Sequence, residues 1–297
     1  MQLPPHHPFR SPEAMRRYHS HYDRQAAMWP VPSNCLTVPT SFGTTFVRIS
    51  GDDALPSLVL LPGMGANSLM WMSMIEGLSR HFRTFAIDSI YDNGKSVWLS
   101  PIRNADGFCR WIDQLLDGLG LGDDVRMIGA SYGAWIAAEY ALRHPNRLCK
   151  LVLMAPAGVV RPLGAGFVCH AIPSMLPLRG LTRRFIGWLM ADLAGREGEG
   201  ASILEAIVDD VMLARECFVS RRPVPPRVLS DNDLRKLNVP TMFLVGENEK
   251  LFSVHKAVKR LELAAPGIKT RILPGCGHDL FVVEAAAAVR ATVDFLV

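Results

Sequence analysis

The chain has 297 residues, of which 49% are hydrophobic and 20% are charged, so it is long enough to bury a large core. This composition excludes a disordered chain, a collagen-like repeat and a small disulfide-rich domain. The 32 basic and 28 acidic residues leave a formal charge of only +4, spread along the sequence, which argues against nucleic acid as a partner and favours a small neutral substrate.

Residues 1–34 form a polar N-terminal arm that is expected to lie on the body as an extension, ending on an apolar patch at Met28, Trp29 and Pro30. The first residues carry Pro, His and Arg where a signal peptide would carry an apolar run. Six cysteines stand far apart without a C-x-x-C pair, which predicts buried free thiols in a reducing, cytoplasmic compartment.

The sequence after the arm predicts a β-hairpin and then an α/β core. Two β-rich runs flank a short turn at residues 41–43. Short apolar runs then follow at 57–61, 83–88, 125–130, 150–155, 240–246 and 269–275. Helical patterns separate most of them and follow the last one, at 67–82, 107–119, 132–144, 253–264 and 281–297. This alternation predicts a mostly parallel central sheet with helices on both faces.

The interval between the apolar runs that end at 155 and begin at 240 is too long for a simple crossover. It contains helical patterns at 183–193 and 201–218 but no strand-like run, which predicts a helical cap inserted after the sixth strand. Stretches rich in Gly or Pro at 195–200 and 221–227 indicate hinges or linkers. The expected division is an arm at 1–34, a catalytic core at 35–156 and 236–297, and a cap at 157–235.

One stretch of the expected cap, residues 162–178, contains no charged side chain. Three prolines interrupt it and it is shorter than the roughly 20 apolar residues that cross a bilayer, so no stable membrane insertion is expected. The stretch is interpreted as a lid or a buried wall. Apolar cap residues that are candidates for the roof of an acyl pocket are Phe167, Ile172, Met175, Leu176, Phe185, Trp188 and Leu189.

The motif G-x-S-x-G at residues 129–133 lies between a predicted strand and a predicted helix. A strand that turns abruptly into a helix strains the residue at the turn, and Gly129 and Gly133 would relieve the crowding around Ser131. The N-terminus of the following helix adds positive potential where an oxyanion would form. Ser131 is therefore the candidate nucleophile, against the simpler interpretation of a chance turn rich in Gly and Ser.

A serine nucleophile needs a base, and the base needs a carboxylate that orients it. His278 follows a predicted strand in the loop GCGH, and it is the one histidine of the nine in such a loop, although a surface histidine could also stand there. Glu247 and Glu249 both follow the run TMFLVG, and either could instead be a solvated charge. The chain order of serine, acid and histidine matches the α/β-hydrolase order rather than either protease order.

These motifs, with WPVP at 29–32, SFGTTFV, GASYGAW, LVGENEKLF and GCGHDLFVVE, give a sequence that resembles the α/β-hydrolase superfamily from about Cys35 to Val297. Within that superfamily the sequence is similar to bacterial carboxylesterases with a short helical cap. The resemblance implies that Glu249 is the acid, at a position where most members carry Asp.

An oxyanion hole requires two backbone N–H groups, and the residue after the nucleophile, Tyr132, is expected to supply one. The resemblance implies that Met64 supplies the other, in the loop Pro62–Gly63–Met64, where Pro62 replaces the family's histidine.

The segment beginning at Gly63 also permits a different interpretation, as a dinucleotide-binding fingerprint with Asp88 as its acidic residue. Ser68 stands where the third glycine would be, and such a fold gives no reason for the serine elbow. Asp88 is more simply explained as a cap for the loop that follows its strand.

The residues predict a serine hydrolase that requires neither a metal nor an organic cofactor, and the resemblance implies a carboxylesterase that acts on small to medium esters. The same three side chains would also serve a carbon–carbon bond hydrolase, a thioesterase, a lactonase or an acyltransferase. A non-catalytic binding protein with a hydrolase-like body is the alternative from another class. A small-molecule ester is the expected partner, nucleic acid is not, and a homodimer is compatible with the sequence.

Overall fold

The computed structural model describes residues 3–4 and 6–297 and contains one twisted sheet of nine strands. Strands β1 and β2 form an antiparallel hairpin, and β2 also pairs antiparallel with β4 and with β5. The remaining neighbours are parallel, in the order β4-β3-β6-β7-β8-β9. The strands are β1 Asn34–Thr40, β2 Gly43–Ser50, β3 Ser57–Leu61, β4 Arg83–Ile87, β5 Val97–Trp98, β6 Val125–Ala130, β7 Leu148–Met154, β8 Thr241–Gly246 and β9 Lys269–Leu273.

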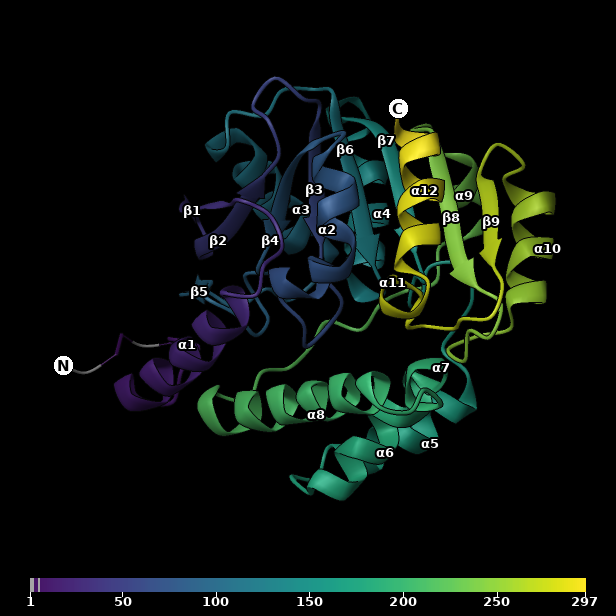
Figure 1. The fold of residues 1–297 in the computed structure, drawn as a ribbon. Coiled ribbons are helices and arrows are strands. Elements are labelled where there is room, and N and C mark those ends of the chain that lie inside the picture. The colour runs from purple at the N-terminus through teal and green to yellow at the C-terminus, as the bar shows by residue number, and fades with distance from the viewer. Residues whose placement is uncertain (1–2, 5) are drawn as a thin grey trace.

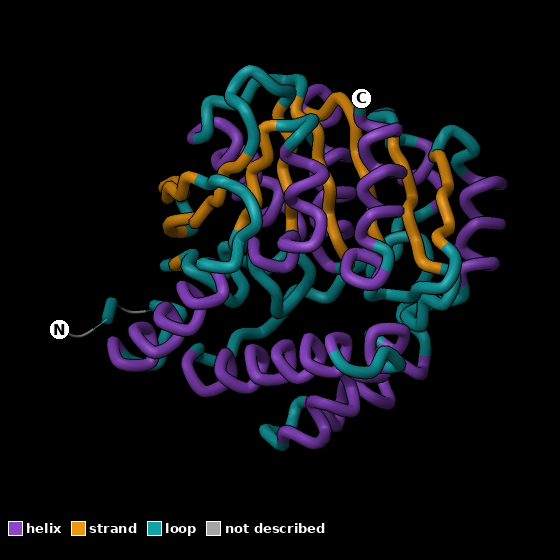
Figure 2. Tube along the Cα trace, viewed as in Figure 1, coloured by secondary structure: helices purple, strands orange, loops and turns teal. Residues whose placement is uncertain are grey.

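Helices cover both faces of the sheet, as Figures 1 and 2 show. One face packs against α2 (Met72–Ser79) and α12 (Ala285–Leu296), and the other against α3 (Ala105–Gly118), α4 (Tyr132–Arg143) and α10 (Val254–Ala264). Strands β3 and β6 are almost wholly buried because both of their faces are covered, which explains their continuous apolar sequence. The α/β-hydrolase architecture predicted from the sequence is confirmed.

The hairpin and the six apolar runs are all strands, but the sequence did not reveal β5, which has only two residues. The cap therefore follows the seventh strand in chain order rather than the sixth. The C-terminal helical pattern is divided at Glu284 into α11 (Leu280–Val283) and α12. Short 3-10 helices, η1 (Ser68–Trp71) and η2 (Pro145–Arg147), complete the core.

The N-terminal arm contains a helix, α1 (Pro12–Ala26), which the sequence interpretation missed. Ser11 caps this helix, its hydroxyl accepting a hydrogen bond from the N–H of Ala14 at 3.0 Å. Tyr18 and Tyr22, one helical turn apart, are buried, and the hydroxyl of Tyr22 donates to Asp88 at 3.2 Å. This spacing of two aromatic residues was the available signal in an otherwise polar segment.

Helices α5 (Ala165–Ser174), α6 (Arg179–Leu189), α7 (Ala191–Ala194) and α8 (Glu199–Cys217) lie between β7 and β8, followed by the short α9 (Asp231–Arg235). In Figure 1, α5 to α8 lie below the edge of the sheet toward which β8 and β9 point. Helix α1 packs against α8, where Gln25 donates to Asp210 at 2.8 Å. The cap is thus held by the N-terminal helix as well as by its own linkers.

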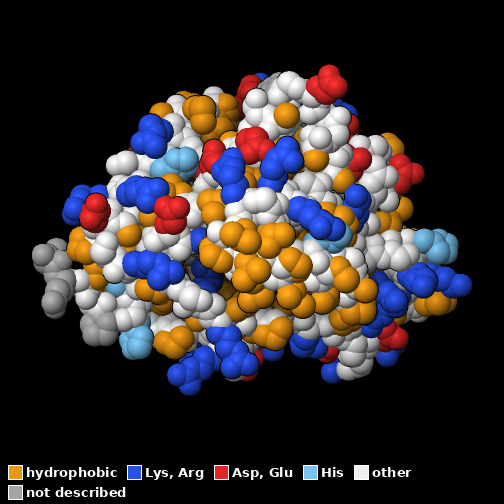
Figure 3. Space-filling view, turned by 90° about the horizontal axis from the view of Figure 1, so that it is seen from below, with side chains coloured by type: hydrophobic (Ala, Val, Ile, Leu, Met, Phe, Trp, Pro, Cys, Tyr) orange, Lys and Arg blue, Asp and Glu red, His pale blue; other side chains and the backbone are white. Residues whose placement is uncertain are grey.

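Of the two interpretations of the uncharged stretch 162–178, a lid or a buried wall, the buried wall is wrong. It includes α5, and its apolar residues Val168, Ile172, Met175, Leu176 and Leu178 are exposed. Figure 3 shows hydrophobic side chains gathered on the face that is seen from the cap side. No helix within the described residues combines the length and the apolar character needed to cross a bilayer.

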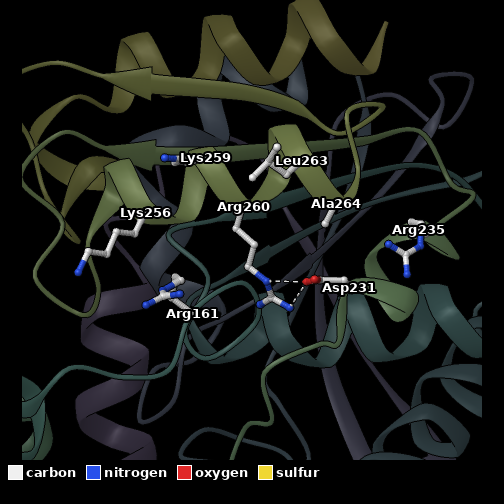
Figure 4. Close-up of a pocket in the computed structure, with 8 residues that line it drawn as sticks. All are labelled: Arg161, Asp231, Arg235, Lys256, Lys259, Arg260, Leu263 and Ala264. Carbon is white, nitrogen blue, oxygen red and sulfur yellow. Dashed lines mark hydrogen bonds and ion pairs between the residues drawn. The ribbon is translucent and has the colours of Figure 1, made fainter.

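Arg260 on α10 ties together the two ends of the segment that carries the cap. Its guanidinium donates to the carbonyl oxygens of Val160 and Leu229, and also to the carboxylate of Asp231 at 2.7 Å (Figure 4). The surrounding cavity of about 340 Å³ has five cationic side chains against one carboxylate, so positive charge that is spread along the sequence gathers here in space. Its lining residues are Arg161, Asp231, Arg235, Lys256, Lys259, Arg260, Leu263 and Ala264.

All six cysteines are free, but the prediction that they are buried is wrong for three of them. The buried thiols are Cys109, Cys217 and Cys276, and the others are Cys35, Cys149 and Cys169. Burial raises the pKa of Cys276 to about 12, so its thiol stays protonated although it is close in sequence to His278.

Candidate active site

Ser131 occupies a strained turn between β6 and α4. Its backbone has φ 52° and ψ −113°, a combination that a non-glycine residue adopts only when its surroundings impose it. A Cβ at Gly129 would lie 2.4 Å from the carbonyl oxygen of Gly133, and a Cβ at Gly133 would lie 2.4 Å from that of Pro62. Only glycine fits at these two positions, and the turn directs Ser131 toward the loop at Gly63, where an added Cβ would lie 4.0 Å from Ser131 Oγ.

His278 lies in the loop between β9 and α11 and reaches Ser131. The distance from His278 Nε2 to Ser131 Oγ is 3.0 Å, and the imidazole is buried. A Cβ at Gly277 would lie 3.0 Å from the carbonyl oxygen of Asn248, so the absence of a side chain there lets the histidine loop approach the loop after β8. In the sequence GCGH, Gly277 thus allows close packing, and Gly275 adopts φ +68°, a backbone conformation that favours glycine.

Glu249, rather than Glu247, contacts the imidazole. His278 Nδ1 donates to Glu249 Oε2 at 2.8 Å, and the other carboxylate oxygen accepts the N–H of Leu251 at 2.9 Å. Glu247 points elsewhere and accepts the N–H of Gly275 at 3.4 Å. The structure therefore brings Ser131, His278 and Glu249 into one hydrogen-bonded series and leaves Glu247 outside it.

Burial and neighbouring negative charges have opposite effects on the pKa of His278. Burial lowers the pKa of the imidazole, whereas the charge and hydrogen bond of Glu249 and the charge of Asp279 raise it, and the net direction is upward from 6.5. Because Nδ1 donates to Glu249, the neutral ring carries its proton there and presents Nε2 to Ser131 as an acceptor. This is the tautomer that a base for Ser131 requires.

Of the two predicted oxyanion donors, Tyr132 directly follows Ser131, and Met64 follows Gly63, where an added Cβ would lie 3.4 Å from Ser131 Cβ. Tyr132 is the first residue of α4, and the first N–H of a helix has no acceptor within that helix. In the loop at 63–66, Gly63 N–H donates to Met70 Sδ at 3.2 Å, Gly65 N–H to Asp92 at 2.9 Å and Ala66 N–H to Gly63 at 3.2 Å. Of the four N–H groups of this loop, that of Met64 is the one not used in these three hydrogen bonds.

The dinucleotide interpretation of this loop is wrong. Asp88 is fully buried, and its carboxylate accepts the N–H groups of Ser68 at 2.8 Å and Lys95 at 2.7 Å as well as the Tyr22 hydroxyl. Burial raises the pKa of Asp88 while these donors lower it, and burial has the larger effect. A carboxylate enclosed in this way stabilises the loop that follows its strand. It is not available to bind the ribose of a dinucleotide, which is the role of the acidic residue in that fingerprint.

Contacts between the cap and the loops after β8 and β9 escaped the sequence analysis. The buried Asp279, next to His278, accepts the N–H of Leu193 on α7 at 2.7 Å. Asn248, next to Glu249, donates to Asp192 on the same helix at 2.8 Å. The cap thus contacts the loops that carry both the base and the acid. The sequence clue was a polar side chain next to each predicted catalytic residue, Asn248 beside Glu249 and Asp279 beside His278.

The cap residues expected to roof the pocket divide into two groups. Ile172, Met175 and Leu176 are exposed, so the prediction is wrong for them. Phe167, Trp188 and Leu189 are partly buried against the cluster that includes Tyr132 and Leu251, and Phe185 packs against the other core cluster. The described residues do not bring three or more His, Cys, Asp or Glu side chains into a group that could hold a metal ion.

The fold and the geometry of the site are those of a hydrolase in which a serine stands on a strand-to-helix turn, and comparison with known proteins agrees. Residues 56–193 match the family described as alpha/beta hydrolase fold. An uncharacterized carboxylesterase, Nap, of Bacillus subtilis is 30% identical over 89% of this chain and 87% of its own length. The chain belongs to the α/β-hydrolase family.

Two further relatives extend the similarity over nearly the whole chain. The carboxylesterase YbfK of Bacillus subtilis is 27% identical over 97% of this chain and 96% of its own length. The crystal structure of a naproxen esterase (carboxylesterase NP) from Bacillus subtilis superposes with a TM-score of 0.87 at 27% identity, covering 96% of this chain and 99% of that one. The similarity therefore includes the cap and the N-terminal helix.

Proposed function

We propose that this protein is a serine carboxylesterase that hydrolyses small to medium carboxylic esters through an acyl-enzyme. The observation that supports this most directly is the series of hydrogen bonds from Ser131 Oγ through His278 to Glu249. Similarity to two Bacillus carboxylesterases over most of the chain supports the same reaction class.

In the proposed acylation step, Ser131 Oγ attacks the ester carbonyl carbon while His278 Nε2 takes its proton. Glu249 keeps the imidazole in the required tautomer and stabilises its positive charge. The N–H groups of Met64 and Tyr132 bind the oxyanion of the tetrahedral intermediate, and each such donor is typically worth about two to three orders of magnitude in rate. The alcohol leaves as His278 returns the proton to its oxygen.

Deacylation repeats these roles with water as the nucleophile. His278 takes a proton from the water as it attacks the acyl carbon, and the same two N–H groups stabilise the second oxyanion. Collapse of this intermediate releases the carboxylic acid and returns the proton to Ser131. Neither step requires a metal or an organic cofactor.

The substrate class is tested with a panel of p-nitrophenyl esters of increasing acyl length, together with a naproxen ester, a thioester, a lactone and a ring-cleavage diketone. The naproxen ester is included because one similar structure is that of a naproxen esterase. Turnover of esters, with a loss of about 10⁶ in kcat for Ser131→Ala, supports the proposal. Turnover of another class without any ester hydrolysis identifies one of the related activities instead.

The partner in this proposal is a small-molecule ester, and the location is the cytoplasm. Six free cysteines support a reducing compartment, because secreted proteins tend to pair their cysteines. A homodimer stays a prediction, which light scattering after size-exclusion chromatography would test.

A further inference from the structure

The chain that returns from the cap to the core, residues 219–229, contacts the side chain of Tyr132 directly and the loop of Met64 through Asp92. The hydroxyl of Tyr132 donates to the carbonyl oxygen of Val224 in this return segment at 2.6 Å. On the other side of Ser131, Arg221 of the return segment forms an ion pair with Asp92, whose second oxygen accepts the N–H of Gly65. Neither contact belongs to the series Ser131–His278–Glu249.

Asp92 and Met70 fix the backbone on either side of the Met64 donor. The N–H of Gly65, which follows Met64, donates to Asp92 at 2.9 Å, and the N–H of Gly63, which precedes it, donates to Met70 Sδ. Because peptide units are planar, holding the units on both sides restricts the direction of the Met64 N–H. Gly65 adopts φ +78°, a backbone conformation that favours glycine, so the turn also depends on this residue type.

The Arg221 side chain is largely buried and is held by several contacts. Its side chain is 16% exposed and that of Asp92 is 6% exposed. The guanidinium also donates to Asn93 Oδ1 at 3.4 Å and lies 5.9 Å from the Tyr91 ring centroid and 6.0 Å from that of Trp98. A planar group with several donors satisfies these partners together, which the single ammonium of lysine does less well.

We propose that Arg221 is a positioning residue for the oxyanion hole: it holds Asp92, and Asp92 holds the loop that presents the Met64 N–H. This inference rests on the proposed function, because it assigns Met64 and Tyr132 to the oxyanion. Since Val224 of the same segment accepts the Tyr132 hydroxyl, the return segment couples the placement of the cap to both donors. The cap thereby acts on the rate of the reaction as well as on access to the site.

The test compares wild type, Arg221→Met, Arg221→Lys and the matched control Arg222→Met, which replaces the neighbouring, exposed arginine. The readouts are kcat and KM on p-nitrophenyl butyrate and the second-order rate of labelling by a fluorophosphonate, in which the serine oxygen displaces fluoride from phosphorus. Arg221→Met should lose about 10- to 100-fold in kcat and in labelling rate, less than removal of a whole donor. KM should change by less than about threefold, Arg221→Lys should recover part of the loss, and Arg222→Met should match wild type.

A merely structural role would lower the melting temperature of Arg221→Met and leave its rate per titrated active site unchanged, which would overturn the inference. If Arg221→Met does not fold, Asp92→Asn replaces it, because the amide still offers an oxygen to Gly65 while losing the charge that pairs with Arg221. Equal labelling of Asp92→Asn and wild type would again overturn the inference. Absence of labelling in wild type would instead reject the proposed function.

Discussion

Replacing Glu249 by glutamine tests how the acid controls the base. One carboxylate oxygen accepts the N–H of Leu251 at 2.9 Å, and the other accepts Nδ1 of His278 at 2.8 Å. A glutamine has one oxygen for these two donors. If its oxygen stays with Leu251, its NH₂ group faces Nδ1, which must then accept and lose its proton.

The proton of the neutral imidazole would move to Nε2, which lies 3.0 Å from Ser131 Oγ. In this tautomer the ring donates to the serine instead of accepting its proton, so it no longer serves as a base. The expected loss in kcat is about 10³- to 10⁴-fold, as for the corresponding Asp-to-Asn change in a protease triad, or about 4 to 5.5 kcal/mol in activation free energy.

The assay is steady-state hydrolysis of p-nitrophenyl butyrate by Glu249→Gln and by the control Glu247→Gln, each normalised to folded protein by circular dichroism. Glu247 accepts only a long hydrogen bond from Gly275, so Glu247→Gln should stay within about twofold of wild type. A larger loss for Glu247→Gln than for Glu249→Gln would refute the assignment of the acid.

Three other predictions concern the turn, the pH dependence and the cap linkers. Gly133→Ala should fail to fold or lose several kcal/mol in the free energy of unfolding, because its Cβ would lie 2.4 Å from the Pro62 carbonyl oxygen. The control Gly180→Ala, which has open space around it, should keep the wild-type melting temperature. Equal melting temperatures of Gly133→Ala and Gly180→Ala would contradict the packing argument. Because the pKa of His278 is raised, kcat/KM of wild type should fall as the pH drops through a pKa above 6.5; a midpoint below 6.5 would contradict the influence of Glu249. Arg260→Met should speed deuterium exchange at 159–161 and 229–231 and cost about 1–3 kcal/mol in unfolding free energy, whereas unchanged exchange would show that the arginine does not hold the linkers.

The core of the fold could be predicted from the sequence because a strand that is buried on both faces has a continuous run of apolar residues. This holds for β3, β6 and β8, whose residues are buried along nearly their whole length. The two-residue β5 and the helix α1 escaped, because two residues carry no period and α1 buries little of its surface. The sequence left stretch 162–178 as either a lid or a buried wall, because an apolar sequence does not say which side of a cap faces the core.

The site was predictable where a local backbone requirement restricts the residue type. Gly129 and Gly133 around Ser131, and Gly277 before His278, mark positions where a side chain would crowd neighbouring backbone, whereas Gly275 adopts φ +68°. The choice between Glu247 and Glu249 came from resemblance, since both follow the same strand. Arg221 and Asp92 were beyond prediction, because their pairing joins residues 129 positions apart and depends on how the cap returns to the core.

The most direct test of the central claim is peptide mapping by mass spectrometry after reaction of the folded wild-type protein with a fluorophosphonate. The account predicts a single stoichiometric adduct on Ser131, absent from Ser131→Ala and formed far more slowly in His278→Ala. An adduct on a different residue, or one that persists in Ser131→Ala, would contradict the account.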